Sequence, residues 1–214
     1  MVRDAKRIHH DIRAISAGGG LTVRETAADP IVDTYRYFRL WDDARDELAA
    51  HLGHHVRLEI EPGRLLVANS GVLVAEVCAL TRMGSNRFVL LDAGFNDLIR
   101  PALYGSSHGT EVITREGDRR DADVSATVLA GPLCESGDVF TQSPDGVVEH
   151  APLPAVVVGD FVVFSNTGAY GASMSSNYNS RPLAPEVLID GGAVRLIRRR
   201  QTIHDLLALE NVAD

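Results

Sequence analysis

Lysine and cysteine are nearly absent from this sequence. Its 214 residues hold a single lysine, Lys6, and two cysteines, Cys78 and Cys134, without a CxxC pair. Two such cysteines cannot form a disulfide framework, which fits a reducing compartment. The sequence also has no apolar run near the roughly 20 residues that span a bilayer, and its first residues lack the apolar segment of a secretory signal. These absences predict a cytoplasmic protein without a membrane partner.

Clustered positive charge and metal-ligand motifs are scarce as well. The net charge is −8, whereas a nucleic-acid partner requires grouped Lys and Arg that contact phosphates. The one basic run, Arg195 and Arg198 to Arg200, is interpreted as the solvated end of a strand. No HExxH or CxxC spacing occurs, so no metal site is predicted. With 45% hydrophobic and 23% charged residues, the composition is that of a globular protein.

The first part of the chain alternates between helix and strand patterns. Residues 2–13 have the pattern of a helix end, and residues 14–17 form a short apolar run before three glycines. A helix is predicted next, with Asp29 as its N-cap, Pro30 at its first position and Gly53 just after its end. A second strand follows and completes a βαβ unit with parallel strands. The apolar stripe of the helix is expected to face a core and comprises Ile31, Tyr35, Phe38, Trp41, Ala44, Leu48 and Leu52.

From Gly71 onward, short apolar runs are separated by turn residues, which predicts an all-β barrel or sandwich. Asp190, Gly191 and Gly192 lie between two such runs and predict a hairpin. Residues 201–210 predict a closing helix with Thr202 as its N-cap. The predicted domains are thus an α/β part over residues 1–65 and a β part over residues 66–214. Two strands cannot cover their own sheet edges, so we expect the α/β part to be a fragment or to need a partner.

Two glycine-containing strand ends are candidates for an anion site. Gly18, Gly19 and Gly20 follow the first strand, and Glu61, Pro62, Gly63 and Arg64 follow the second. Glycine lets backbone N–H groups approach a phosphate closely, and arginine offers a planar fork for phosphate or carboxylate. A turn without a ligand remains an alternative for the glycines, and a surface ion pair remains one for Arg64.

Polar and aromatic side chains in the β part suggest a substrate site. Arg100 and Tyr104 lie four residues apart, with Pro101 permitting a helix only in its first turn. Arg100 is a candidate for a substrate carboxylate and Tyr104 for a hydroxyl contact. Residues 166–182, rich in small and polar residues around Tyr170 and Tyr178, predict a surface or site loop.

The segment GPLCESGD, residues 131–138, raises the question of chemistry at Cys134. A thiol can donate a proton or act as a nucleophile, depending on its surroundings. The alternative is a buried, inert cysteine, which is the prediction for Cys78 because it lies between Val77 and Ala79. A Cys/His hydrolase at Cys134 has no supporting histidine pattern.

Five ordered motifs give the sequence a family resemblance. The segments SAGGGL, EPGR, DAGFNDLIRPALYG, GPLCESGD and GAYGASMSSNYNSRP resemble the C-terminal half of diaminopimelate decarboxylases, which use pyridoxal phosphate and make lysine. The resemblance runs over nearly all of the chain. It implies the last strands and helices of a (β/α)8 barrel that binds the cofactor, followed by a β-barrel like that of alanine racemases.

The resemblance also implies roles for the candidate residues. Gly18, Gly19, Gly20 and the segment Glu61–Arg64 would hold the phosphate of pyridoxal phosphate, which serves as the electron sink. Cys134 would donate the proton and Glu135 would contact the substrate meso-diaminopimelate, both reaching into the other subunit of a homodimer. The remaining substrate contacts would be Arg64, Arg100, Tyr104 and Tyr170, of which Tyr170 would also touch the cofactor.

One departure from the family concerns lysine. The lysine that carries the cofactor and the histidine that stacks on it belong to early barrel strands, which this sequence does not contain, and Lys6 matches no family motif. We therefore expect the chain to be inactive by itself. Two alternatives stay open: a non-catalytic homologue that pairs with or regulates an intact decarboxylase, and a related basic amino-acid decarboxylase, against which Arg100 argues because it would repel a substrate that ends in an amine.

Overall fold

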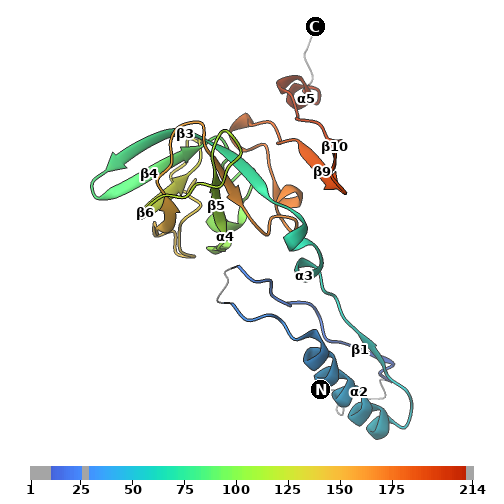
Figure 1. Cartoon of the computed structure of the whole chain (residues 1–214). Helices are drawn as coiled ribbons and strands as arrows, with labels where there is room; N and C mark the ends of the chain where they lie inside the picture. The colour runs from blue at the N-terminus through green and yellow to red at the C-terminus, as the bar shows by residue number, and fades with distance from the viewer. Residues whose placement is uncertain (1–10, 26–28, 211–214) are drawn as a thin grey trace. The chain divides into compact units, whose positions relative to one another are not determined.

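The computed structural model describes residues 11–25 and 29–210. The chain forms two compact units, of which the first ends at Ala68 and the second begins at Asn69 (Figure 1). The sequence places the boundary after residue 65, inside the short helix α3 (Arg64–Val67). Lys6 and most of the helix predicted over residues 2–13 lie outside the described residues, and residues 11–13 are not helical.

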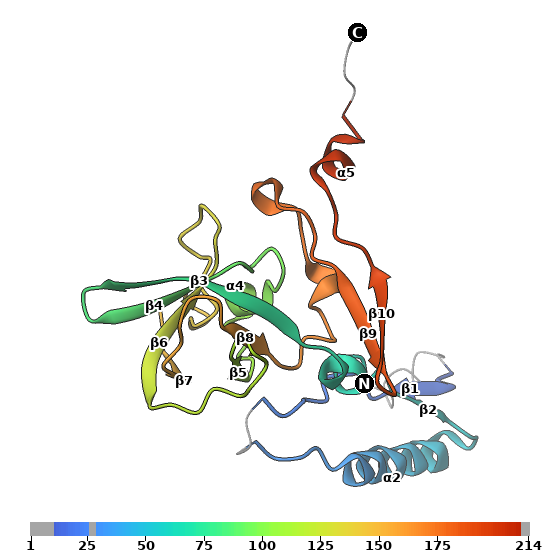
Figure 2. The same cartoon turned by 45° about the horizontal axis from the view of Figure 1, so that its top comes forward.

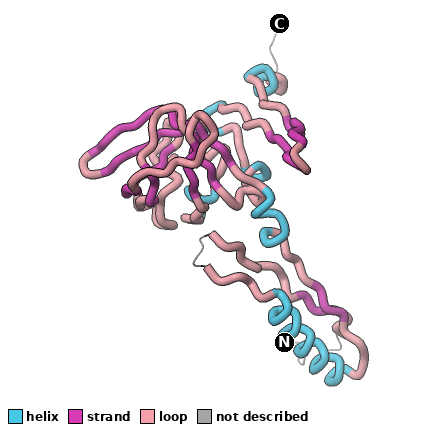
Figure 3. The backbone as a smooth tube through the Cα atoms, in the orientation of Figure 1, coloured by secondary structure: helices cyan, strands magenta, loops and turns pink. Residues whose placement is uncertain are grey.

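The first unit contains the predicted βαβ arrangement. Strand β1 (Ala14–Ser16) pairs in parallel with β2 (Arg57–Glu59), with Ile15 opposite Leu58. Helix α2 (Thr34–Leu52) connects the two strands along the chain (Figure 3). Parallel pairing requires such a crossover connection, so both strands end at the same edge of the pair.

Helix α2 begins later than predicted. Its N-cap is Asp33, whose carboxylate accepts a hydrogen bond from the N–H of Arg36 at 2.8 Å. The prediction of Asp29 was wrong because that carboxylate instead accepts from the N–H of Glu25, at 2.9 Å, in the preceding loop. The predicted end is confirmed: Gly53 has φ of 80° and donates its N–H to the carbonyl of Ala49, which is the left-handed cap that glycine favours.

The apolar stripe of α2 is only partly covered. Trp41, Ala44, Leu48 and Leu52 are half-buried. Ile31 and Tyr35 are 75% and 72% exposed, and Phe38 is exposed as well. The predicted stripe therefore holds for the last three turns, where the helix lies against β2.

The second unit is built on a six-stranded sheet. Its strand order is β5-β8-β3-β4-β6-β7, in which only β4 and β6 pair in parallel. The strands are β3 (Leu73–Met83), β4 (Asn86–Leu91), β5 (Thr110–Ile113), β6 (Val124–Ala130), β7 (Ala151–Pro154) and β8 (Phe161–Phe164).

Strand β3 bends the sheet toward a barrel. Its first residues pair with β8 and its later ones with β4, and the register shifts between Val77 and Ala79. Such a bulge bends a strand and increases its twist. The edge strands β5 and β7 come close together, so the sheet is nearly closed (Figure 2).

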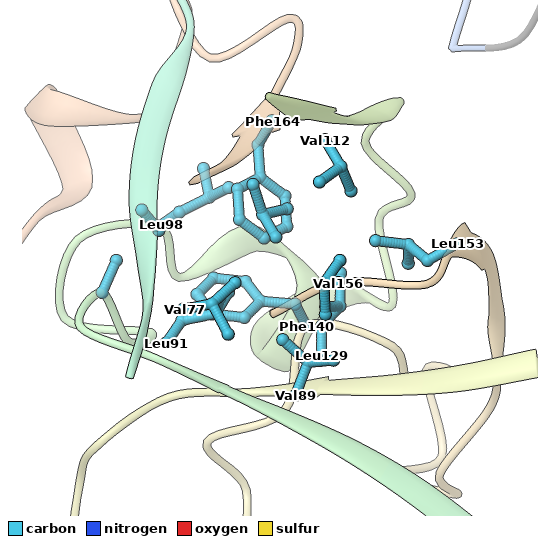
Figure 4. Packing of buried hydrophobic residues seen from close by; sticks show 13 residues of the cluster. Val77, Val89, Leu91, Leu98, Val112, Leu129, Phe140, Leu153, Val156 and Phe164 are labelled. Atoms are coloured by element: carbon cyan, nitrogen blue, oxygen red, sulfur yellow. The ribbon is translucent and has the colours of Figure 1, made fainter. Parts of the chain in front are cut away.

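Buried side chains fill the interior of this curled sheet (Figure 4). The rings of Phe140 and Phe164 lie 4.7 Å apart in a tilted arrangement. Val77, Val89, Leu129 and the other residues of this cluster come from every strand of the sheet and from the loops between them: Ala75, Leu91, Ala93, Leu98, Val112, Leu153, Val156 and Val162. The short helices α4 (Arg100–Tyr104), η1 (Ala68–Ser70), η2 (Ala172–Met174) and η3 (Tyr178–Ser180) lie in the connections.

The predicted hairpin and closing helix are confirmed. Strands β9 (Glu186–Asp190) and β10 (Ala193–Arg198) pair antiparallel around Gly191 and Gly192, but they form a separate two-stranded sheet rather than part of the barrel. Helix α5 (Ile203–Leu207) starts with a capping box of Thr202 and Asp205. In the basic run, Arg198 at the end of β10 pairs with Glu186, and Arg199 pairs with Asp205.

Strands β5 and β7 carry too few consecutive apolar residues to stand out in the sequence, and a turn precedes β8. One prediction in the β part is wrong. Cys78 is exposed, not buried, because it points outward from β3 between the buried Ala75 and Val77 and the half-buried Ala79. Partial burial and the carboxylates of Asp92 and Glu76 nevertheless raise the pKa of its thiol.

Candidate active site

The two glycine-containing strand ends meet in the first unit. The N–H of Glu61 donates to the carbonyl of Gly18 at 2.8 Å. A Cβ at Gly19 would lie only 2.6 Å from the carbonyl oxygen of Glu61, so no larger residue fits there. Gly18 and Gly20 have φ of 67° and 84°, a conformation in which glycine is strongly favoured. The structure thus brings together the two segments that the sequence suggests for an anion.

Backbone N–H groups are available at these strand ends. The N–H of Gly18 donates to the hydroxyl of Ser16, which in turn donates to the carboxylate of Glu61 at 2.9 Å. Within the described ranges, no protein acceptor takes the N–H of Gly19, Gly20 or Gly63. Arg64 is half-buried and forms no ion pair among the described residues, so the surface ion pair considered for it is not observed there. Bare N–H groups beside an arginine fit a phosphate.

Arg100 forms the centre of an aromatic group in the second unit. Pro101 lies in the first turn of α4, so Arg100 and Tyr104 share one short helix. The Cζ atom of Arg100 lies 5.6 Å from the ring centroid of Tyr104 and 5.3 Å from that of Tyr170, within cation–π range. Its Nη2 donates to the hydroxyl of Ser106 at 3.1 Å. The guanidinium is thereby held while several of its five donors stay available for a carboxylate.

The loop that carries Tyr170 is held in an unusual backbone conformation. Asn166, Tyr170, Asn179 and Ser180 all have positive φ, between 52° and 62°. Non-glycine residues in this region cost roughly 1–3 kcal/mol each and concentrate at functional sites. Gly171 is buried, and a Cβ there would collide with the carbonyl of Thr167. These constraints hold the Tyr170 ring over Arg100.

Cys134 and Glu135 project from the loop that follows β6, and both are exposed. The Glu135 carboxylate accepts hydrogen bonds from the Gly137 N–H at 3.2 Å, the Tyr178 hydroxyl at 3.1 Å and the Ser136 hydroxyl at 3.3 Å. These donors, led by Gly137, lower the pKa of Glu135 below its usual value, and Glu135 in turn raises the pKa of Tyr178. Glu135 is therefore a fixed negative charge beside the Cys134 thiol.

The second unit thus has two groups of site residues, one around Arg100 and one around Cys134 and Glu135. Two segments of the chain contribute to both groups. Phe95 precedes the Arg100 helix, and its ring lies 4.9 Å from that of Tyr178, which holds Glu135. Residues 166–180 contribute Tyr170 to one group and Tyr178 to the other. Sequence reasoning identifies Tyr178 only as part of a loop and misses Phe95 and Ser106. No pattern marks these three, because their roles depend on contacts between distant segments.

This fold and these residues agree with the class of protein found by comparison. A family model described as pyridoxal-dependent decarboxylase, C-terminal sheet domain, matches residues 10–168. The chain belongs to this family.

Curated relatives that match nearly the whole chain are diaminopimelate decarboxylases. The chain is 65% identical to the one from Streptomyces coelicolor over 210 residues, covering 98% of this chain and 48% of the relative. It is 59% identical to the one from Escherichia coli K12 over 211 residues, covering 98% and 50%. The chain therefore spans about half the length of the curated relatives it matches.

Solved structures give the same result. A crystal structure of diaminopimelate decarboxylase, 59% identical, superposes with a TM-score of 0.90 over 98% of this chain and 50% of that chain. The Helicobacter pylori diaminopimelate decarboxylase complexed with L-lysine, 34% identical, has a TM-score of 0.79 and covers 97% and 47%. The predicted fold class, the end of a (β/α)8 barrel followed by an alanine-racemase-like β-barrel, is confirmed. In the described part of the chain, no helix is long and apolar enough to cross a membrane.

Proposed function

We propose that this chain is the C-terminal half of a diaminopimelate decarboxylase, which converts meso-2,6-diaminopimelate to L-lysine and CO2 with pyridoxal phosphate. The observation that carries the proposal is the 59–65% identity to such enzymes along 98% of the chain. The side chains of both site groups suit this substrate, because it carries a second carboxylate and a second ammonium group beyond the reacting centre. The substrate therefore needs one cationic and one anionic partner of its own.

The first unit supplies groups that fit the cofactor phosphate. The N–H groups of Gly19, Gly20 and Gly63 have no described protein acceptor, and Arg64 directly follows Gly63 along the chain. We assign Gly18 to Gly20 and Glu61 to Arg64 to the phosphate. The backbone of Glu61 and Pro62 shapes this site, because the Glu61 carboxylate is itself an anion and is occupied by Ser16.

Cys134 is the proposed proton donor. Pyridoxal phosphate, when bound, would supply an electron sink for the electron pair that remains at the α-carbon. When the bond between the α-carbon and the carboxylate breaks, the Cys134 thiol transfers its proton to that carbon, and solvent then reprotonates the thiolate. A positioned acid contributes about 10²–10⁴-fold to such a step.

Arg100 and Glu135 are the proposed partners of the distal end of the substrate. The guanidinium of Arg100, which lies within cation–π range of Tyr104 and Tyr170, would bind the distal carboxylate, with Tyr104, Tyr170 and Arg64 as further contacts. The carboxylate of Glu135 would accept a hydrogen bond from the distal ammonium. We further propose that the enzyme is a cytoplasmic homodimer in which Cys134 and Glu135 complete the site of the partner subunit. The exposure of both Cys134 and Glu135 in the single chain supports this arrangement.

The test uses a hybrid enzyme in which this chain is joined behind the part of the Escherichia coli relative that it does not match. Release of CO2 from meso-diaminopimelate by the purified hybrid, with L-lysine as product, is the expected result. Cys134→Ala should abolish most of this activity, and the matched control Cys78→Ala should not. A folded hybrid without activity would refute the proposal and favour a non-catalytic homologue.

A further inference from the structure

Asp138 is a buried carboxylate at the end of the Cys134 loop. The residue is 3% exposed. Its Oδ1 accepts a hydrogen bond from the N–H of Phe95 at 2.7 Å, and its Oδ2 accepts one from the N–H of Leu133 at 2.8 Å. Its own backbone closes the loop, since its carbonyl accepts from the Gly131 N–H at 2.9 Å and its N–H donates to the Glu135 carbonyl at 3.1 Å.

Two glycines from different segments make room for this carboxylate. A Cβ on Gly131 would lie 2.6 Å from the Asp138 Cγ and would collide with both of its oxygens. A Cβ on Gly94 would lie 2.9 Å and 3.0 Å from those oxygens. Neither glycine has a positive φ, so glycine is needed at both positions for space rather than for backbone conformation. The backbone at Gly94 and Gly131 therefore leaves the space that the buried Asp138 carboxylate occupies, and a larger residue at either position would take that space.

The two N–H donors place Asp138 between the site groups. Leu133 directly precedes Cys134, and the ring of Phe95 packs on Tyr178, the partner of Glu135. Phe95 also belongs to the segment that leads into α4 and Arg100. Burial raises the pKa of Asp138, while the N–H groups of Leu133 and Phe95 oppose that rise. Hydrogen bonds to a charged acceptor are stronger than those between neutral groups.

We propose that Asp138 is a positioning residue, which fixes the Cys134–Glu135 loop against the Phe95 segment so that the thiol is presented at the reacting carbon. The inference rests on the proposed function only in giving Cys134 its role as proton donor. The attachment of the loop through Asp138 is independent of that role.

The kinetic test uses Asp138→Asn in the hybrid enzyme, with the exposed Asp145→Asn as control. The asparagine keeps one acceptor oxygen and replaces the other with an NH2 group facing an N–H. We expect kcat to fall at least about tenfold, a part of the 10²–10⁴-fold that a positioned acid supplies, and KM for meso-diaminopimelate to rise as well, because the same loop carries Glu135, the proposed partner of the distal ammonium. A general loss of folded protein would lower the amount of active enzyme but would change neither kcat per active site nor KM.

Further variants test the inference if Asp138→Asn folds poorly. Gly94→Ala displaces the carboxylate by only a few tenths of an ångström and should lower kcat by a smaller factor. Gly131→Ala should lower kcat strongly with Asp138 present and have no further effect in the Asp138→Ala background. Unchanged kcat in Asp138→Asn, or additive effects of Gly131→Ala and Asp138→Ala, would overturn the proposal.

Hydrogen exchange in the 214-residue chain separates this inference from the proposed function. Asp138→Asn should speed exchange of the Leu133 N–H at least about tenfold, as loss of one charge-assisted hydrogen bond implies, and leave the β9–β10 amides unchanged. If the wild-type hybrid proves inactive, faster exchange would still support the attachment of the loop. Equal exchange in both chains would refute it regardless of activity.

Discussion

Replacement of Arg100 by lysine tests how the distal carboxylate is recognised. Arginine has five N–H donors in a rigid plane, whereas lysine has three on a compact, flexible group. In the structure one donor of Arg100 binds Ser106, and its Cζ atom lies within cation–π range of the rings of Tyr104 and Tyr170. A lysine keeps the charge but loses the planar fork and its two-bond contact with a carboxylate.

The expected magnitude follows from the loss of one charge-assisted hydrogen bond. Such a bond is worth about 1.5–3 kcal/mol, and each 1.4 kcal/mol corresponds to about tenfold in affinity. We therefore expect Arg100→Lys to raise KM for meso-diaminopimelate about 10–150-fold. The effect on kcat should be small, because the distal carboxylate is bound equally before and during the reaction.

Steady-state kinetics of the hybrid enzyme measure this effect, with Arg82→Lys on the exposed end of β3 as the matched control. Arg82→Lys should leave both constants unchanged. An unchanged KM for Arg100→Lys would refute the assignment of Arg100 to the distal carboxylate. A fall in kcat without a rise in KM would instead place Arg100 at the reacting centre.

Three further predictions concern other contacts. Tyr178→Phe removes a hydrogen-bond donor to Glu135, so the pKa of that carboxyl should rise toward its usual value. The carboxylate should then lose its charge at a higher pH as the solution is acidified. NMR titration of the Glu135 carboxyl carbon measures this pKa. Asp160→Asn weakens the ion pair between the buried Asp160 carboxylate and Arg120, whose side chain is 25% exposed. In urea titrations it should lower the free energy of unfolding by about 2–3 kcal/mol, below the 3–5 kcal/mol typical of fully buried pairs. Gly19→Ala would place a Cβ 2.6 Å from the carbonyl of Glu61, and should weaken cofactor binding at least about tenfold in a fluorescence titration, as loss of one phosphate hydrogen bond implies.

Each of these has a result that contradicts it. For Tyr178→Phe the contradicting result is an unchanged or lower pKa of Glu135, because the Gly137 N–H and the Ser136 hydroxyl would then account for the whole lowering of that pKa. For Asp160→Asn it is a change below about 0.5 kcal/mol, the range of ordinary surface substitutions. For Gly19→Ala it is wild-type cofactor affinity in a folded hybrid, with the exposed Thr22→Ala as the control.

Local patterns predict the parts of the fold that local physics determines. Gly53 and Thr202 mark helix boundaries in the sequence because capping depends on neighbouring residues, and Gly191 with Gly192 indicates a hairpin for the same reason. The start of α2 is missed because the Asp29 carboxylate accepts from the N–H of Glu25 in the preceding loop, while Asp33 caps the helix. The exposure of Cys78 is misjudged because flanking apolar residues do not reveal which way a strand alternates.

The candidate site shows the same division. Motifs mark Cys134, Arg100 and the glycines, because their chemistry is visible in the residue types. The contacts that hold them, from Tyr178, Phe95 and Asp138, come from segments about 40 residues apart along the chain. No sequence period or motif connects such segments, so the supporting residues could be found only from the structure.

The most direct test of the account is a comparison of substrates on the purified hybrid enzyme. CO2 release would be measured from meso-diaminopimelate, L-lysine and L-ornithine under identical conditions. The account predicts turnover of meso-diaminopimelate with L-lysine as the product and at least about tenfold lower kcat/KM for the two substrates that lack a distal carboxylate, the loss expected for one charge-assisted hydrogen bond. Equal or faster turnover of L-lysine or L-ornithine would contradict it.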